Sequence, residues 1–86
     1  MKRRLLLAWQ VIEFIERLPR TERQRIRKRL LEIAAAPGPF SDFTEDDPSG
    51  RAHDVHLFGR YTIRYWDDFA DRDVKIVDIA QTERLS

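Results

Sequence analysis

The sequence predicts a single α+β domain, spanning residues 1–86, in which two helices precede a small antiparallel sheet. A chain of 86 residues has room for one hydrophobic core. Apolar residues follow helical spacing in the first 36 positions, and strand-like runs occupy residues 52–80. Helices grouped before strands are typical of α+β domains, in which the helices pack on one face of the sheet.

The first segment, residues 3–18, is compatible with two structures. Its apolar residues follow helical spacing throughout, which favours one long helix. Alternatively, Arg3 to Leu7 form a short strand and a helix follows over residues 10–17. Pro19 ends the segment in either case, because proline disrupts a continuing helix.

A second helix is predicted from Thr21 to the Pro37-Gly38-Pro39 turn. Thr21 and Gln24 form a T-x-x-Q capping box at its start. Its apolar stripe consists of Ile26, Leu30, Ile33 and Ala34, and its other faces carry Arg20, Arg23, Arg25, Arg27, Lys28 and Arg29. The two helices, joined at Pro19-Arg20, form an αα-hairpin.

Three strands are predicted after an acidic loop at residues 40–50. They cover residues 52–58, 60–67 and 74–80, and Gly59 turns the first pair into a hairpin. Alternation along these strands assigns a core face and an open face. The core face holds Val55, Leu57, Ile63, Tyr61 and Tyr65, whereas the open face holds Asp54, His56, Thr62, Arg64 and Trp66. Arg60 lies at the turn, and the register decides whether Lys75 or Asp78 joins the open face.

Several classes of chemistry are excluded by what the chain lacks. It has no cysteine, hence no disulfide framework or thiolate metal site, which suits a reducing cytoplasm. His53 and His56 have odd spacing on a strand and therefore point to opposite faces, which argues against a zinc pair. No phosphate-binding glycine loop and no nucleophile motif is present. We therefore expect no metal and no cofactor. The basic, apolar start resembles a signal peptide, but Gln10 and Glu13 interrupt it, and no run is long enough to span a membrane.

The net charge of +1 hides a strong asymmetry along the chain. Residues 1–36 contain ten Lys and Arg against four acidic residues, whereas residues 37–86 contain six against eleven. The basic half of the chain can bind phosphate or an acidic partner. It can equally be a pair of solvated helices whose long basic side chains cover apolar surface.

The open face combines an imidazole, guanidinium groups and an aromatic ring, a set that suits bound RNA. Guanidinium groups clamp phosphate, aromatic rings stack on bases, and histidine transfers protons near neutral pH. A metal-free ribonuclease needs little more, because a base, a cation and an acid complete the reaction. The alternative is a solvated face with cross-strand pairs, such as Asp54 or His56 opposite Arg64.

Three segments of the chain resemble the RelE/ParE superfamily of type II toxin–antitoxin toxins. They are "IEFIERLPRTERQRIRKRLLEIAAAPGPF", "HDVHLFGRYTIRYW" and "VKIVDIAQTER". The first is similar to the family's helix, leucine-proline turn and basic second helix, and the second to its strand, turn and aromatic-rich strand. The resemblance implies the order β-α-α-β-β-β and therefore favours a strand at Arg3 to Leu7. It also implies a bacterial toxin held inactive by a cognate antitoxin.

The family's functional residues are only partly present in this sequence. The resemblance places the family's arginine after the tyrosine at Thr62, and a second family arginine near Thr82. Arg60 or Arg64 can supply the first cation instead, and Arg84 the second if the tail bends back. The resemblance further implies that His56 is the residue of its strand able to act as base or acid.

The resulting expectation is a ribosome-dependent mRNA endonuclease that inhibits translation in the cytoplasm. Its catalytic residues are His56, Arg60 and Arg64; its RNA-binding residues are Tyr61, Trp66, Lys75, Arg84, Arg23 and Arg27. The expected partners are an antitoxin, with which the chain forms a hetero-oligomer, and the ribosome with its mRNA. The alternatives are a non-enzymatic inhibitor of DNA gyrase, an inactive member that acts by protein binding, and a free RNA-binding module. Convergence of His56, Arg60 and Arg64 on one phosphate-sized site would favour the nuclease.

Overall fold

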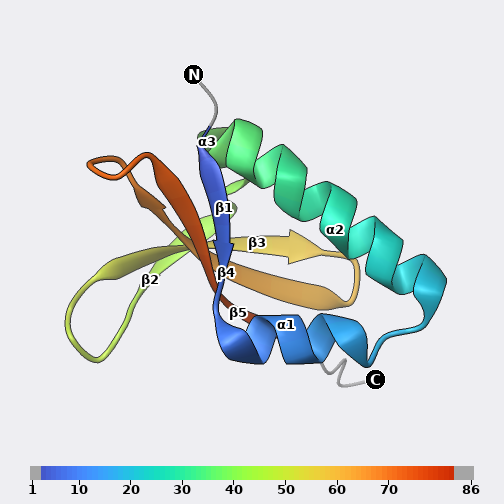
Figure 1. Ribbon diagram of the computed structural model, residues 1–86. Coiled ribbons are helices and arrows are strands. Elements are labelled where there is room, and N and C mark those ends of the chain that lie inside the picture. The colour runs from blue at the N-terminus through green and yellow to red at the C-terminus, as the bar shows by residue number, and fades with distance from the viewer. Residues whose placement is uncertain (1–2, 83–86) are drawn as a thin grey trace.

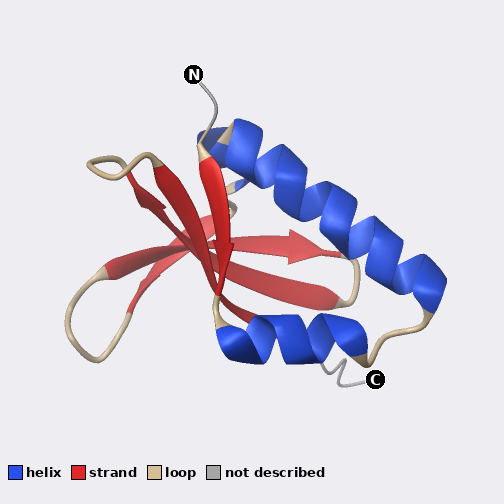
Figure 2. Cartoon of the chain, in the orientation of Figure 1, coloured by secondary structure: helices blue, strands red, loops and turns tan. Residues whose placement is uncertain are grey.

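The computed structural model describes residues 3–82, which form one sheet and three helices (Figures 1 and 2). In chain order the elements are β1 (Arg4–Leu7), α1 (Trp9–Glu16), α2 (Arg20–Ala35), α3 (Pro37–Phe40), β2 (Phe43–Asp46), β3 (Ala52–Phe58), β4 (Tyr61–Asp68) and β5 (Asp73–Gln81). Among these residues no helix is long and apolar enough to cross a membrane.

The sheet has the order β1-β5-β4-β3-β2, and both long helices lie on one of its faces (Figure 1). β1 pairs parallel to β5, and every other neighbouring pair in this sheet is antiparallel. The strand interpretation of residues 3–7 is therefore confirmed, and so are the predicted α+β class and helical hairpin. Pairing with β5 stabilises β1 as a strand because β5 supplies hydrogen-bond partners that an isolated four-residue segment lacks.

The hydrophobic core lies between the helices and the sheet. Its buried side chains are Val11, Ile15, Ile26, Leu30, Ile33, Ala34, Tyr61, Ile63, Tyr65, Val74, Ile76 and Ile79. The predicted apolar stripe of the second helix is thus confirmed in full. The tyrosine rings are core as well, and the Tyr65 hydroxyl donates a hydrogen bond to the carbonyl of Pro37. That bond ties the core to the start of α3.

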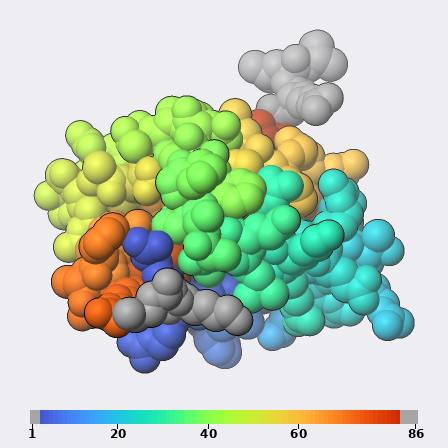
Figure 3. Space-filling model, turned by 90° about the horizontal axis from the view of Figure 1, so that it is seen from above, coloured from blue at the N-terminus to red at the C-terminus, as the bar shows by residue number. Residues whose placement is uncertain are grey.

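Two local predictions were wrong. The predicted acidic loop contains β2, an exposed strand that pairs with β3 at the edge of the sheet. On the face in Figure 3, α2 passes from teal into green, and the green and yellow-green residues of α3 and β2 continue from it. The predicted Thr21 cap is absent, because α2 begins at Arg20 after Pro19 and has no side-chain cap. Proline at this position already has a backbone angle that suits a helix entry.

The side chains of β3 point to the opposite sides of the sheet from those predicted, and this changes the candidate site. β3 and β4 are joined by a two-residue turn, Gly59-Arg60, so Phe58 pairs with Tyr61 and His56 pairs with Ile63. Directly paired residues point to the same side of a sheet. His56 therefore shares the helix-covered face with the tyrosines, and Val55 and Leu57 share the opposite face with Arg64 and Thr62. Leu57 is accordingly 51% exposed, whereas His56 is 7% exposed.

Candidate functional site

His56 lies at the centre of a chain of hydrogen bonds beneath α2. Its Nε2 atom is 2.7 Å from Nη1 of Arg29, and its Nδ1 atom is 3.1 Å from Oδ2 of Asp42. A guanidinium group has only donors, so Nε2 accepts this bond and the neutral ring carries its proton on Nδ1. The Nδ1–H group then donates to the Asp42 carboxylate. The two neighbours fix both the tautomer and the orientation of the ring.

Asp42 is held as a carboxylate by donors from β3. The backbone N–H of Leu57 donates to its Oδ2 atom at 2.8 Å. This bond, followed by the contact with His56, holds the pKa of Asp42 below its ordinary value despite some desolvation. A negative charge therefore stays beside His56 throughout the neutral pH range.

Aromatic rings enclose the imidazole. Phe58 stacks on His56 with the ring centroids 6.1 Å apart, and Phe40 approaches edge-on at 5.4 Å. The Arg29 guanidinium lies over both phenyl rings, 4.3 Å from the centroid of Phe58 and 5.1 Å from that of Phe40. These rings bury the imidazole, while the Asp42 carboxylate stays partly exposed.

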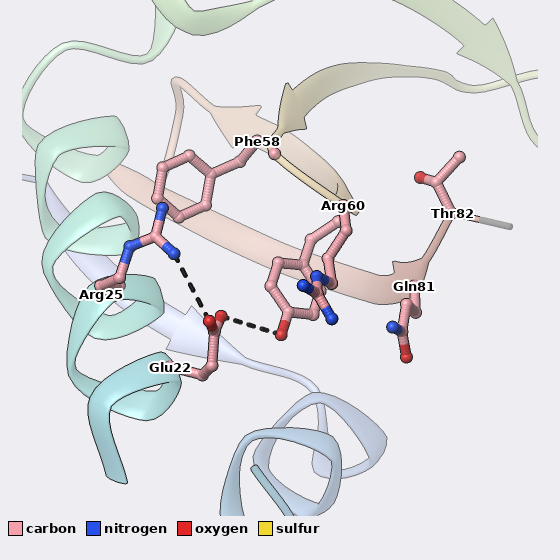
Figure 4. Close-up of a pocket in the computed structure, with 8 residues that line it drawn as sticks. Glu22, Arg25, Phe58, Arg60, Gln81 and Thr82 are labelled. Carbon is pink, nitrogen blue, oxygen red and sulfur yellow. Dashed lines mark hydrogen bonds and ion pairs between the residues drawn. The ribbon is translucent and has the colours of Figure 1, made fainter. Parts of the chain in front are cut away.

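An open pocket of about 840 Å³ lies beside this cluster, between α2, the β3–β4 turn and the end of β5 (Figure 4). Glu22, Arg25, Phe58, Gly59, Arg60, Tyr61, Gln81 and Thr82 line it. Gly59 has a φ of 59°, a conformation that glycine adopts without strain, and it brings Arg60 to the rim. Phe58 belongs to both regions, so the pocket and the His56 cluster are adjacent.

Glu22 links the two sides of the pocket. Its carboxylate accepts the Tyr61 hydroxyl at 3.0 Å and an Arg25 N–H at 3.5 Å, as the dashed lines in Figure 4 show. Burial, followed by the bond to Glu22, raises the pKa of Tyr61, and the positive charges of Arg60 and Arg25 partly oppose that rise. The Tyr61 hydroxyl therefore remains protonated at neutral pH.

Two threonines stand side by side where the family resemblance implies arginines. The Oγ1 atoms of Thr62 and Thr82 are 2.7 Å apart, and the Thr82 backbone N–H donates to the carbonyl of Arg60. The two positions are thus adjacent in space although they belong to different parts of the chain. Neither carries a charge, so this part of the sheet offers hydroxyl groups in place of cations.

Arg64 is not near His56. It lies on the opposite face of the sheet, where its guanidinium contacts Asp78 at 3.0 Å and Glu45 at 3.4 Å. His56, Arg60 and Arg64 therefore do not converge on one site, the arrangement that would have favoured the nuclease, because β3 faces the other way. The contacts of Arg64 are those of a cross-strand ion pair.

Trp66 and Lys75 also occupy the face opposite the helices. Lys75 lies over the Trp66 ring at 4.7 Å and contacts Asp68 at 2.9 Å, while Arg51 lies over the same ring at 3.8 Å. An irregularity between Arg64 and Tyr65 shifts the pairing with β5. As a result, both Lys75 and Asp78 share this face, whereas the sequence favoured one or the other.

The remaining predicted residues lie elsewhere. Helical geometry places Arg23 and Arg27 on the flank of α2 opposite Arg25 and Arg29. Arg84 lies outside the described residues. Within residues 3–82 no group of three or more histidine, cysteine or carboxylate side chains is arranged to hold a metal ion. His53 contacts Asp47 at 3.4 Å on the other side of the sheet from His56.

Four residues of the site were missed by sequence reasoning: Glu22, Arg25, Arg29 and Asp42. The first three recur at i, i+3 and i+7, which places them on one flank of α2. A two-residue turn at Gly59-Arg60 would have paired His56 with Ile63 and turned the imidazole toward that flank. Asp42 carried no such signal, because it reaches His56 only through the pairing of β2 with β3.

Comparison with known proteins identifies the fold. No protein-family model matches the sequence, and no curated protein matches it. Solved structures do match: a chain of the archaeal RelE–RelB complex from Pyrococcus horikoshii OT3 aligns with a TM-score of 0.79 at 20% identity, covering 98% of this chain and 99% of that chain. The chain has the RelE fold. The isolated E. coli RelE toxin matches at TM-score 0.75 and 16% identity, covering 95% of this chain and 86% of that chain.

A chain of the intact E. coli RelBE toxin–antitoxin complex also matches, with a TM-score of 0.72 at 16% identity, and covers 95% of this chain and 99% of that chain. The match spans nearly the whole of each RelE-type chain. It confirms the RelE-like fold that the sequence resemblance implied, including the strand at the N-terminus and the helical hairpin. Sequence identities of 16–20% establish the fold alone. The chemistry follows only from the residues of this chain.

Proposed function

We propose that this chain is the toxin of a type II toxin–antitoxin system, and that it acts by cleaving mRNA on the ribosome. The observation that carries the proposal is the hydrogen-bonded pair Asp42–His56. A base oriented by a carboxylate, beside a pocket lined by guanidinium groups, is the arrangement that general-base cleavage of RNA requires. The ribosome as target places the protein in the cytoplasm.

The proposed reaction uses His56 as base and Arg29 and Arg60 as cations. When a phosphodiester enters, Arg29 turns its donors to the phosphate and releases Nε2 of His56. Nε2 then takes the proton of the ribose 2′-hydroxyl, whose oxygen attacks phosphorus. The bond to the 5′-oxygen breaks, which leaves a 2′,3′-cyclic phosphate. The 5′-oxygen takes a proton from a water in the open pocket, and the hydroxide so formed takes the proton that His56 holds. Positive charge on Arg29 and Arg60 stabilises the phosphorane.

The proposed partner is a cognate antitoxin. The matched RelE chains from P. horikoshii and E. coli come from RelE–RelB and RelBE complexes. In this chain, β2 is an exposed edge strand, and large apolar side chains are exposed: Leu6, Trp9, Leu31, Phe43, Leu57 and Phe69. An unpaired strand edge and exposed apolar surface favour a partner that covers both. We therefore propose that the chain forms a hetero-oligomer with its antitoxin.

A second candidate is a toxin that acts by binding a protein target, such as DNA gyrase, without cleaving RNA. Thr62 and Thr82 favour it, because they replace the two arginines that the family resemblance implies and bond to each other. The Arg29 contact favours it too, since it occupies the nitrogen that a base would use. In this case the polar site is structural.

Induced expression in a bacterial host distinguishes these candidates. His56→Gln keeps hydrogen-bonding capacity but removes the base, so the nuclease proposal predicts that growth arrest and cleavage of ribosome-bound mRNA are both lost. Arrest by this variant equal to that of the wild type would support protein binding instead. Co-expression of a cognate antitoxin should restore growth in both cases. No arrest by the wild type would contradict the toxin proposal.

A further inference from the structure

We propose that the pocket between α2 and the β3–β4 turn binds a monoanionic phosphodiester of single-stranded RNA through Arg25 and Arg60. The inference rests on the proposed function, and it names the group that holds the substrate. Neither of these two arginines occupies a position at which the family resemblance implies an arginine, since those positions are Thr62 and Thr82. The inference also assigns Glu22 the role of a positioning residue that sets the charge of the pocket.

The two threonines show that the cations of this site have to come from other elements. Thr62 and Thr82 bond to each other at 2.7 Å, and Thr82 lines the pocket. Arg25 enters from α2 and Arg60 from the turn, on two sides of the same pocket (Figure 4). Thus the positive charges that line this pocket come from the helix and the turn, and not from the threonine positions of the sheet.

The charges that line the pocket favour a single negative charge. Two guanidinium groups and one carboxylate give a net charge of +1, so one phosphodiester charge neutralises it. The Glu22 carboxylate is already engaged by Tyr61 and Arg25. In the described part of the chain, the guanidinium of Arg60 makes no hydrogen bond and no ion pair, which leaves its donors available to a ligand.

The rest of the lining fits a nucleotide better than an acidic side chain. Gln81 places an amide at the rim, where it can bond to ribose hydroxyls, whereas the Thr82 hydroxyl is already bonded to Thr62. Phe58 presents an aromatic ring, over which Arg25 lies at 5.4 Å. A pocket of about 840 Å³ falls within the size range of sites that hold small organic ligands. A carboxylate alone would leave the Gln81 amide without a partner.

The test is a titration of the full chain with a deoxydinucleotide, which carries one phosphodiester and cannot be cleaved because it lacks a 2′-hydroxyl. A short peptide rich in glutamate is titrated in parallel. Binding is followed by NMR chemical shifts in wild type, Arg25→Ala, Arg60→Ala, Arg60→Lys, Glu22→Gln and Lys28→Ala. Lys28 lies on the outer side of α2. Its substitution by alanine removes one positive charge, as the arginine-to-alanine substitutions do, so Lys28→Ala is the matched control. Thermal unfolding of each variant verifies that it is folded.

The expected result is saturable dinucleotide binding that Arg25→Ala and Arg60→Ala each weaken by about tenfold. Arg60→Lys should recover part of the affinity, Lys28→Ala should leave it unchanged, and Glu22→Gln should strengthen it because the pocket gains positive charge. Equal losses for Lys28→Ala and Arg60→Ala would overturn the inference, because they would show that any positive charge suffices. Binding of the peptide without the dinucleotide would overturn it too.

The proposal of a phosphodiester pocket and the proposal of a toxin can be contradicted separately. Dinucleotide binding at Arg25 and Arg60 in a protein that does not arrest growth would support the pocket and contradict the toxin. Growth arrest that survives Arg25→Ala and Arg60→Ala, without dinucleotide binding by the wild type, would overturn the pocket and the role of Arg60 as a cation, but not the toxin.

Discussion

The Nδ1 atom of His56 lies 3.1 Å from Oδ2 of Asp42, and this contact joins β3 to the segment that follows α3. It orients the only histidine that faces the helices among the described residues. The opposite nitrogen, Nε2, points toward the basic flank of α2. The proposed cleavage of RNA depends on whether this oriented imidazole acts as a base.

Asp42→Asn should slow RNA cleavage without weakening RNA binding. The amide keeps the shape of the side chain but loses the charge that fixes the Nδ1–H tautomer. We expect kcat to fall by about tenfold to a hundredfold, with KM little changed. Steady-state kinetics on ribosome-bound mRNA measures both values. A change confined to KM would show that Asp42 acts on binding.

Asp42 should also make stability depend on pH in the acid range. Its pKa is lowered in the folded chain, so its contribution is complete above the ordinary value of 3.8 and is lost as the pH falls through the lowered value. The difference in free energy of unfolding between wild type and Asp42→Asn should therefore be constant from neutral pH to about 5 and shrink below 3.8. Denaturant unfolding at a series of pH values measures this difference. A difference that grows on acidification would contradict the assignment.

Arg64 and Arg60 should respond differently to the same substitution. Arg64→Met removes the contacts to Asp78 and Glu45 and should cost about 0–1 kcal/mol of stability, less at high salt, while growth arrest persists. Arg60→Met should leave stability unchanged, because its guanidinium has no ion pair within residues 3–82, and should weaken arrest. Thermal melts and growth curves provide the two measurements. Loss of arrest in the folded Arg64→Met variant would return Arg64 to the catalytic set.

Tyr65→Phe should destabilise the fold without affecting the pocket. The Tyr65 ring is fully buried, and its hydroxyl donates to the Pro37 carbonyl. Removing the hydroxyl leaves that carbonyl without its partner, at a cost of about 1–3 kcal/mol. The denaturant midpoint should fall while its slope is retained. Dinucleotide binding by the folded variant should equal that of the wild type.

Most of the framework could be predicted from the sequence because it depends on local patterns. The apolar stripe of α2 and the alternation in β4 mark their own buried faces. The prolines at 19 and at 37–39 mark the ends of the helices. β2 was missed because "FTED" has no alternating apolar residues and all four side chains are exposed. It is a strand because β3 offers it a pairing edge.

The site was harder to predict because its residues meet through tertiary contacts. Val55 and Leu57 looked like a core pair, yet the turn sets the register and places Leu57 in solvent. His56 takes the inner side because Phe40, Phe58 and Arg29 enclose it, and these belong to different elements. A single strand contains no information about such neighbours. Only the length of the Gly59-Arg60 turn indicated the correct face.

Whether His56 is the base of an mRNA nuclease is tested by cleavage of mRNA on programmed ribosomes by the purified chain, with new 5′ ends mapped at nucleotide resolution. His56→Gln serves as the matched variant, and its folding is verified by thermal unfolding. The account predicts cuts in ribosome-bound mRNA by the wild type and none by His56→Gln. Equal cleavage by both proteins would contradict His56 as the base. An absence of cuts by a wild type that arrests growth would contradict the nuclease itself.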